Sequence, residues 1–108
     1  EPSTYEFYKI PDGKHSFTWP NGATYLGEWN NDSPHGKGTM KWPDGTIHEG
    51  KFVNGQPGGS GKHKHTFSNG IIYEGEWKYG KANGKGIMKW PDGSVYNGDF
   101  INGNPMTK

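Results

Sequence analysis

The sequence predicts an all-β protein, an elongated single-layer antiparallel β-meander of stacked hairpins. The main observation is a pattern of a ring, a glycine and a second ring at alternate positions, which begins at residues 25, 48, 73 and 96. The copies are 23, 25 and 23 residues apart, a period typical of arrays whose units bury their apolar faces against one another. Two further observations agree: turn sequences separate short alternating runs, and no segment keeps a helical period.

Composition bounds the size and chemistry of the molecule. Only 28% of the 108 residues are hydrophobic but 15% are aromatic, so rings, each burying roughly 150–250 Å², must supply most of a thin core. The net charge of +1 argues against a nucleic-acid partner. The chain has no cysteine, which excludes disulfides. It shows no apolar stretch of about 20 residues to span a membrane and no signal-peptide pattern.

The hairpin turns are the first elements to place. Each is expected where an aromatic residue precedes Asp or Asn and then Gly, mostly after a proline, because these residues favour a type I turn followed by a left-handed glycine. The predicted turns are 19–23, 42–46, 67–71 and 90–94. The runs on both sides of each turn are predicted strands, and connectors such as 30–35 join one hairpin to the next.

Counting outward from the turns predicts the register of the strands. Met40 should face His48, and Gly38 should face Gly50. One face of the sheet therefore carries rings around paired glycines, where another group can approach closely. We expect a ring of the adjoining hairpin to lie over each glycine gap, which would interlock the units.

The opposite face of the sheet is expected to be charged. The same register places Lys14 across from Glu28, Lys62 across from Glu76 and Lys85 across from Asp99, with Lys37 and Lys51 as a like-charged pair. Opposite charges in such pairs contribute about 0.2–1 kcal/mol each.

The chain is expected to divide into a cap or linker at residues 1–11 and a repeat array at 12–108. The array holds about three and a half repeats, at 12–24, 25–47, 48–72, 73–95 and 96–108. Tyr5, Phe7 and Tyr8 make the first segment a candidate cap across the aromatic face. The strands near 13–19 and 94–100 are the two edges of the predicted sheet, and because edges present unpaired backbone groups, a homodimer is one expected state.

The repeated unit resembles the MORN repeat, the membrane occupation and recognition nexus motif. Residues 73–93 carry its Tyr-x-Gly-x-Trp, Gly-x-Gly and Asp-Gly elements, and the unit at 25–38 also carries its His-Gly pair. The resemblance covers about residues 12–103. The unit at 48–72 departs from the pattern: His48 replaces the leading tyrosine, His63 and His65 take the places of a glycine and a methionine, and its connector is two residues longer.

The resemblance implies an elongated meander of MORN-type hairpins with a shallow aromatic groove. It also implies a non-enzymatic interaction or scaffold module, intracellular, in the cytoplasm and associated with cytoskeletal, ciliary or membrane structures. We expect the groove to bind a peptide or helix of a partner protein, or of a second copy. Inner rings should pack in the core while rim rings remain exposed. The candidate anchors are the aromatic residues, which dominate most interfaces: Tyr25, Trp29, Trp42, Phe52, Tyr73, Trp77, Trp90, Tyr96 and Phe100.

Two binding alternatives are open. The first is a phospholipid or membrane-surface module that uses Lys37, Lys41, Lys85 and Lys89. Acidic neighbours neutralise this row, whereas attraction to anionic lipid needs roughly 4–8 uncompensated cations. The second is recognition of carbohydrate or choline, because aromatic cages hold quaternary ammonium groups.

Catalysis and cofactors are not expected. The Gly-x-Gly pairs lie in hairpins rather than before a helix, so a phosphate loop is not supported. The one metal candidate is the set His48, His63 and His65, because pairing of consecutive hairpins would bring them within reach of a zinc ion. A chance cluster of packed imidazoles is the simpler explanation. Without a metal, protonation of these histidines would loosen the middle hairpin below about pH 6.

Overall fold

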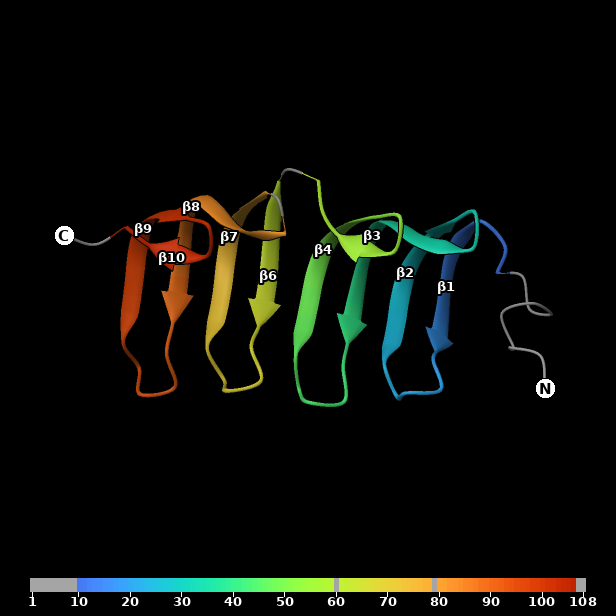
Figure 1. The fold of residues 1–108 in the computed structure, drawn as a ribbon, viewed down its shortest axis with the longest axis horizontal. Coiled ribbons are helices and arrows are strands. Elements are labelled where there is room, and N and C mark those ends of the chain that lie inside the picture. The colour runs from blue at the N-terminus through green and yellow to red at the C-terminus, as the bar shows by residue number, and fades with distance from the viewer. Residues whose placement is uncertain (1–9, 60, 79, 107–108) are drawn as a thin grey trace.

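The computed structural model describes residues 10–59, 61–78 and 80–106, which contain strands and turns but no helix. Their strands form one antiparallel sheet that follows the chain order, except that the short β5 pairs only with β4 (Figure 1). The predicted all-β single-layer meander is confirmed. The strands are β1 Gly13–Thr18, β2 Thr24–Asn30, β3 Ser33–Lys41, β4 Ile47–Val53, β5 Gln56–Pro57, β6 Lys62–Thr66, β7 Ile72–Lys78, β8 Lys81–Lys89, β9 Val95–Ile101 and β10 Asn104–Pro105.

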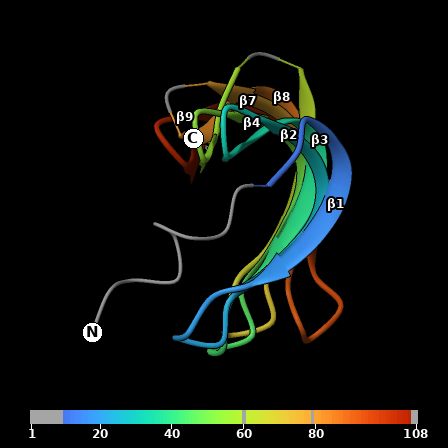
Figure 2. The ribbon, with the colours of Figure 1, turned by 90° about the vertical axis from the view of Figure 1, so that its right-hand side faces the viewer.

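The molecule is elongated, with extents of 53 × 25 × 20 Å, and consecutive hairpins lie side by side along its long axis (Figure 1). Figure 2 shows the sheet end on as one curved layer, whose strand ends opposite the hairpin turns bend over to one side. A single layer has no second sheet to cover it, so its two faces differ only through their side chains. The aromatic cap proposed for Tyr5, Phe7 and Tyr8 lies outside the described residues.

The hairpin turns form as their sequences predict. The Trp42 N–H donates to the Thr46 carbonyl at 2.9 Å, and the Gly45 N–H donates to the Trp42 carbonyl at 3.0 Å. Asp44 Oδ1 accepts the Thr46 N–H at 2.9 Å. Gly45 has a φ of 97°, a left-handed conformation that glycine adopts without steric cost. The same backbone bonds close the turns at 19–23, 67–71 and 90–94.

The predicted register is confirmed on both faces. Met40 pairs with His48 and Gly38 with Gly50, and the three predicted Lys–acid pairs lie opposite each other. One position from each long strand lines up across the whole sheet. We call this line the glycine row: His15, Gly27, Gly38, Gly50, His63, Gly75, Gly86 and Gly98.

The buried rings form two separate clusters on one face. The N-terminal cluster contains Tyr25, Trp29, Met40 and Phe52, and the C-terminal cluster contains Tyr73, Trp77, Ala82, Met88 and Phe100. Between them, β4 pairs with the short strand β6 at only three positions, Ile47, His48 and Glu49. The third unit therefore joins two aromatic clusters through a short ladder, and this is where the histidines lie.

Candidate functional site

The nine predicted anchor rings divide into a buried and a half-buried set. Six are buried in the two clusters: Tyr25, Trp29, Phe52, Tyr73, Trp77 and Phe100. Trp42, Trp90 and Tyr96 are half-buried and pack only against the outside of the clusters. Fewer rings are therefore accessible on this face than the nine anchors that the sequence predicts.

Tyrosines cover the glycine row. The Tyr25 hydroxyl donates to the Glu28 carbonyl at 3.0 Å, and its ring lies so close over Gly38 that any Cβ there would overlap it. Tyr73 repeats this arrangement over Gly86, with its hydroxyl donating to a main-chain carbonyl at 2.6 Å. The prediction that a ring of the adjoining hairpin covers the glycine gap is confirmed at both places. Burial and then the nearby Glu28 charge raise the pKa of Tyr25 to about 12, so its hydroxyl keeps its proton.

Three imidazoles replace this arrangement in the third unit. His48 stands in the tyrosine position and is fully buried. Its Nε2 lies 2.8 Å from His63 Nδ1, and its Nδ1 lies 2.9 Å from His65 Nδ1. His63 occupies the glycine row, and its ring fills the space over Gly50. We call His48, His63 and His65 the histidine seam.

The seam is a chain of neutral imidazoles. A neutral imidazole has one N–H and one acceptor nitrogen, so each ring can donate one hydrogen bond. Each of the two contacts needs one such N–H between its two nitrogens. The chain is satisfied when His63 donates to His48 and His48 donates to His65. The Nε2 of His63, which is buried without a partner, is then a bare lone pair rather than a buried N–H.

Burial lowers the pKa of all three imidazoles. Burial, and then the neighbouring His65 and His63, lower the pKa of His48 to about 3. Burial followed by the Lys51 charge lowers the pKa of His63, and burial lowers that of His65. Because desolvation disfavours the charged form, the seam is uncharged near neutral pH.

The seam does not form a metal site. His63 and His65 contact opposite nitrogens of His48, so three lone pairs cannot converge on one ion as zinc requires. No group of three or more His, Cys, Asp or Glu in the described part of the chain is arranged to hold a metal. The register that brings the three histidines together is confirmed, and in the orientations described their nitrogens contact one another.

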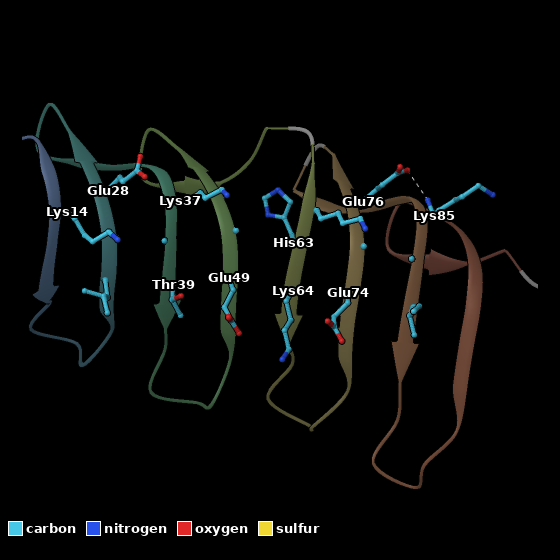
Figure 3. A pocket seen from close by; sticks show the side chains of 18 of the residues that line it. Lys14, Glu28, Lys37, Thr39, Glu49, His63, Lys64, Glu74, Glu76 and Lys85 are labelled. Carbon is cyan, nitrogen blue, oxygen red and sulfur yellow. Dashed lines mark hydrogen bonds between the residues drawn. The ribbon is translucent and has the colours of Figure 1, made fainter.

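The charged face carries a trough of about 1080 Å³ that crosses most of the strands. Figure 3 shows lysine and glutamate side chains along it, and the backbone of the glycine row contributes to its lining. Of the four lysines considered for lipid binding, two have acidic partners: Lys85 Nζ lies 3.5 Å from Asp99, and Lys89 Nζ lies 3.4 Å from Glu74. Both lysines and glutamates line this trough, while Lys37 and Lys51 face each other on this face as like charges.

A second row of rings lies at the hairpin turns. Each turn begins with one ring, and we call these four residues the turn-end row: Trp19, Trp42, Phe67 and Trp90. Phe67 is 38% exposed, and the three tryptophans are half-buried. The sequence reasoning named Trp42 and Trp90 but missed Trp19 and Phe67. Their place directly before the turns was the signal that could have found them.

Comparison with protein families identifies the repeat. The model of the MORN repeat matches residues 25–47, 48–71 and 73–95, which is more than half of the chain. The chain belongs to the MORN repeat family. MORN repeats are non-catalytic modules that generally serve interaction or membrane association. A search of curated proteins found no match to this chain. In the described residues of this MORN array, no helix has the length and apolar character needed to cross a membrane.

Proposed function

We propose that this MORN array is a non-enzymatic interaction module that binds a peptide or helix of a partner protein along the turn-end row. The observation that supports this is the incomplete burial of all four rings of that row, in a protein whose other large rings lie mostly in its core. Aromatic residues that stay accessible on a preformed surface are the usual anchors of an interface.

The spacing of the row suits a regular peptide. Each hairpin contributes two strands about 4.8 Å apart, so successive rings repeat roughly every 10 Å. Side chains seven residues apart on a helix are about 10.5 Å apart, and side chains three residues apart on a polyproline II chain lie on one side about 9 Å apart. A partner segment that crosses the strands can therefore place one apolar side chain at each ring.

The experiment compares the full chain with its Trp42→Ala and Trp90→Ala variants. Proteins captured from a cell lysate by the wild type are identified by mass spectrometry, and their affinity for each variant is then measured by calorimetry. Leu26→Ala is the matched control, because Leu26 is 59% exposed on the charged face. We expect both tryptophan variants to weaken binding while Leu26→Ala does not. Folded tryptophan variants with unchanged affinity would exclude the turn-end row as the binding surface.

The phospholipid alternative is tested separately. Flotation with liposomes that contain phosphoinositide, at low salt, would show binding if the charged face were a lipid-binding surface. The pairing of Lys85 and Lys89 with acidic residues favours the peptide over the lipid, because screening and neighbouring carboxylates leave little net attraction.

A further inference from the structure

The aromatic face has a hollow beside the C-terminal cluster. It has a volume of about 380 Å³, and its lining includes the rings of His65, Phe67 and Trp77 together with Ala82 and Met88. Lys81 is the charged residue in that lining. The hollow thus combines an aromatic and aliphatic wall with one cation.

The internal repeat explains why the hollow exists. Strands β6 to β9 repeat β1 to β4 at a distance of 48 residues, so Phe67 corresponds to Trp19 and Trp77 to Trp29. In the first half, the Trp19 and Trp29 indoles stack with centroids 6.0 Å apart and planes 30° apart. In the second half, the Phe67 and His65 rings meet edge to face with their centroids 4.5 Å apart. The phenyl ring of Phe67 is smaller than the indole of Trp19, and among the described residues it makes no ring contact with Trp77.

Two further reductions in size surround the same place. Ala82 stands where the first half has Pro34, and Gly80 stands where it has Asp32. Both Ala82 and Gly80 line the hollow. In the first half, Ile10 also packs against the aromatic cluster, and its N–H donates to Asp32 Oδ1 at 2.8 Å. His65 stacks on Trp77 with centroids 5.5 Å apart and planes 26° apart, so this imidazole takes part of the place that Trp19 has in the first half, and the hollow is the part that remains open.

The charge at this place also changes between the halves. Asp32 carries a carboxylate in the first half, whereas the second half has the neutral Gly80 and, in the next position, Lys81 in place of Ser33. A ligand that complements this lining brings an aromatic ring against Phe67, Ala82 and Met88 and a negative charge against Lys81.

We propose that this hollow receives an aromatic side chain of a partner polypeptide, with an acidic residue adjacent to it in the partner's sequence and set against Lys81. This inference rests on the proposed function, since Phe67 belongs to the turn-end row, and it specifies one anchor of the partner. The hollow takes the ring between Phe67, Ala82 and Met88, beside the stacked rings of His65 and Trp77, and Lys81 selects for the neighbouring acid.

Blocked dipeptides test the proposal directly. The ¹⁵N-labelled full chain is titrated with N-acetyl-Asp-Trp-amide, N-acetyl-Lys-Trp-amide and N-acetyl-Asp-Ala-amide, and amide and indole N–H resonances are followed by NMR. We expect saturable shifts at Phe67, Trp77 and Ala82 with Asp-Trp, in the millimolar range that so few atoms allow. Lys-Trp should bind about threefold to tenfold more weakly because it faces Lys81 with a like charge, and Asp-Ala should not saturate.

Two variants locate the binding. Phe67→Trp restores the indole of the first half, so it should fill the hollow and reduce Asp-Trp affinity at least about tenfold, the loss of one buried ring contact. Lys81→Ala should abolish the preference for Asp-Trp over Lys-Trp while both still bind. The matched control is Trp19→Phe, which should open the corresponding place and add shifts around Trp29.

The outcomes separate this proposal from the proposed function. Saturable shifts that Phe67→Trp leaves unchanged would place the ring elsewhere and overturn the proposal, as would the absence of saturation by any dipeptide. Shifts at Phe67 and Trp77 that grow with protein concentration alone, and that Phe67→Trp removes, would make a second copy the occupant and also overturn it. None of these outcomes tests the proposed function. The proposed function is tested separately, by the effect of Trp42→Ala and Trp90→Ala on partner affinity.

Discussion

The halves of this array and the junction between them cover the glycine row in different ways. In the first half, the Tyr25 hydroxyl reaches across Gly38 to a main-chain carbonyl. In the third unit His48 is too short to do this, and His63 fills the row and meets it at 2.8 Å. Where His48 replaces the tyrosine, His63 also replaces the glycine. The same sheet geometry is therefore supported either by a tyrosine ring that covers a glycine or by two imidazole rings in contact.

The two arrangements respond differently to acid. The pKa of Tyr25 is raised to about 12, so its hydroxyl stays neutral in acid and at neutral pH. The pKa of His48 is lowered to about 3. The folded protein therefore keeps His48 neutral at pH values below about 6.5, where the unfolded chain would protonate it. Of these two arrangements, the histidine seam is the one that couples the sheet to acid.

The largest effect is expected from Gly38→Ala, which attacks the tyrosine arrangement. A Cβ at Gly38 would overlap the Tyr25 ring, and a buried ring cannot move aside without opening the N-terminal cluster. We expect a loss of about 3–5 kcal/mol in the free energy of unfolding, measured by urea denaturation and tryptophan fluorescence. Gly58→Ala is the control, because its Cβ would meet only ordinary contacts at 3.6–3.7 Å. Equal losses in the two variants would mean that the ring over Gly38 does not matter.

The second prediction concerns the pH dependence of stability. Since the folded pKa of His48 lies below its unfolded value, its contribution is complete above about pH 6.5 and is lost as the pH falls toward 3. At pH 5 His48 alone should cost about 2 kcal/mol of the free energy of unfolding, and the lowered pKa values of His63 and His65 act in the same direction. Urea denaturation at pH 7 and pH 5 measures the loss.

The surroundings of the seam do not offset this cost. Glu49 and Lys64 pair across the charged face beside it, and Lys51 acts on His63 in the direction that further disfavours its charge. The matched control is the double variant His48→Tyr/His63→Gly, which rebuilds the arrangement of the first half. Its unfolding free energy should change much less between pH 7 and pH 5. A wild type that is equally stable at both values would show that the seam does not titrate.

The third prediction compares the two buried tryptophans of the array. Trp29 Nε1 donates to the His15 carbonyl at 2.8 Å, whereas the corresponding Nε1 of Trp77 is buried without a partner. Trp29→Phe and Trp77→Phe remove similar apolar area, but only the first breaks a hydrogen bond. We expect Trp29→Phe to lower the free energy of unfolding by about 1 kcal/mol more than Trp77→Phe. A larger loss from Trp77→Phe would show that its indole N–H is satisfied in solution.

The sequence predicted the sheet well because its determinants are local. The turns at Gly45 and its counterparts set the register, and counting outward from them placed Gly38 opposite Gly50 and His65 opposite His48. It could not predict how three imidazoles orient, because ring rotation depends on packing against neighbours distant in sequence. For the same reason the hollow beside Trp77 was missed, since it arises from small differences in volume between corresponding residues.

The smallest effect should come from the charged face, where the halves also differ. Lys85 and Asp99 form an ion pair at 3.5 Å, but their side chains are 83% and 59% exposed. In the first half the corresponding positions are Lys37 and Lys51, which face each other as like charges. Because water screens both pairs, Lys85→Ala should change the free energy of unfolding by no more than about 0.5 kcal/mol. Lys51→Asp, which gives the first half the charge pattern of the second, should stabilise the protein by a similar amount, and the gain should shrink in 1 M salt. A change above about 1 kcal/mol in either variant would mean that the charged face, and not only the covering of the glycine row, sets the stability of each half.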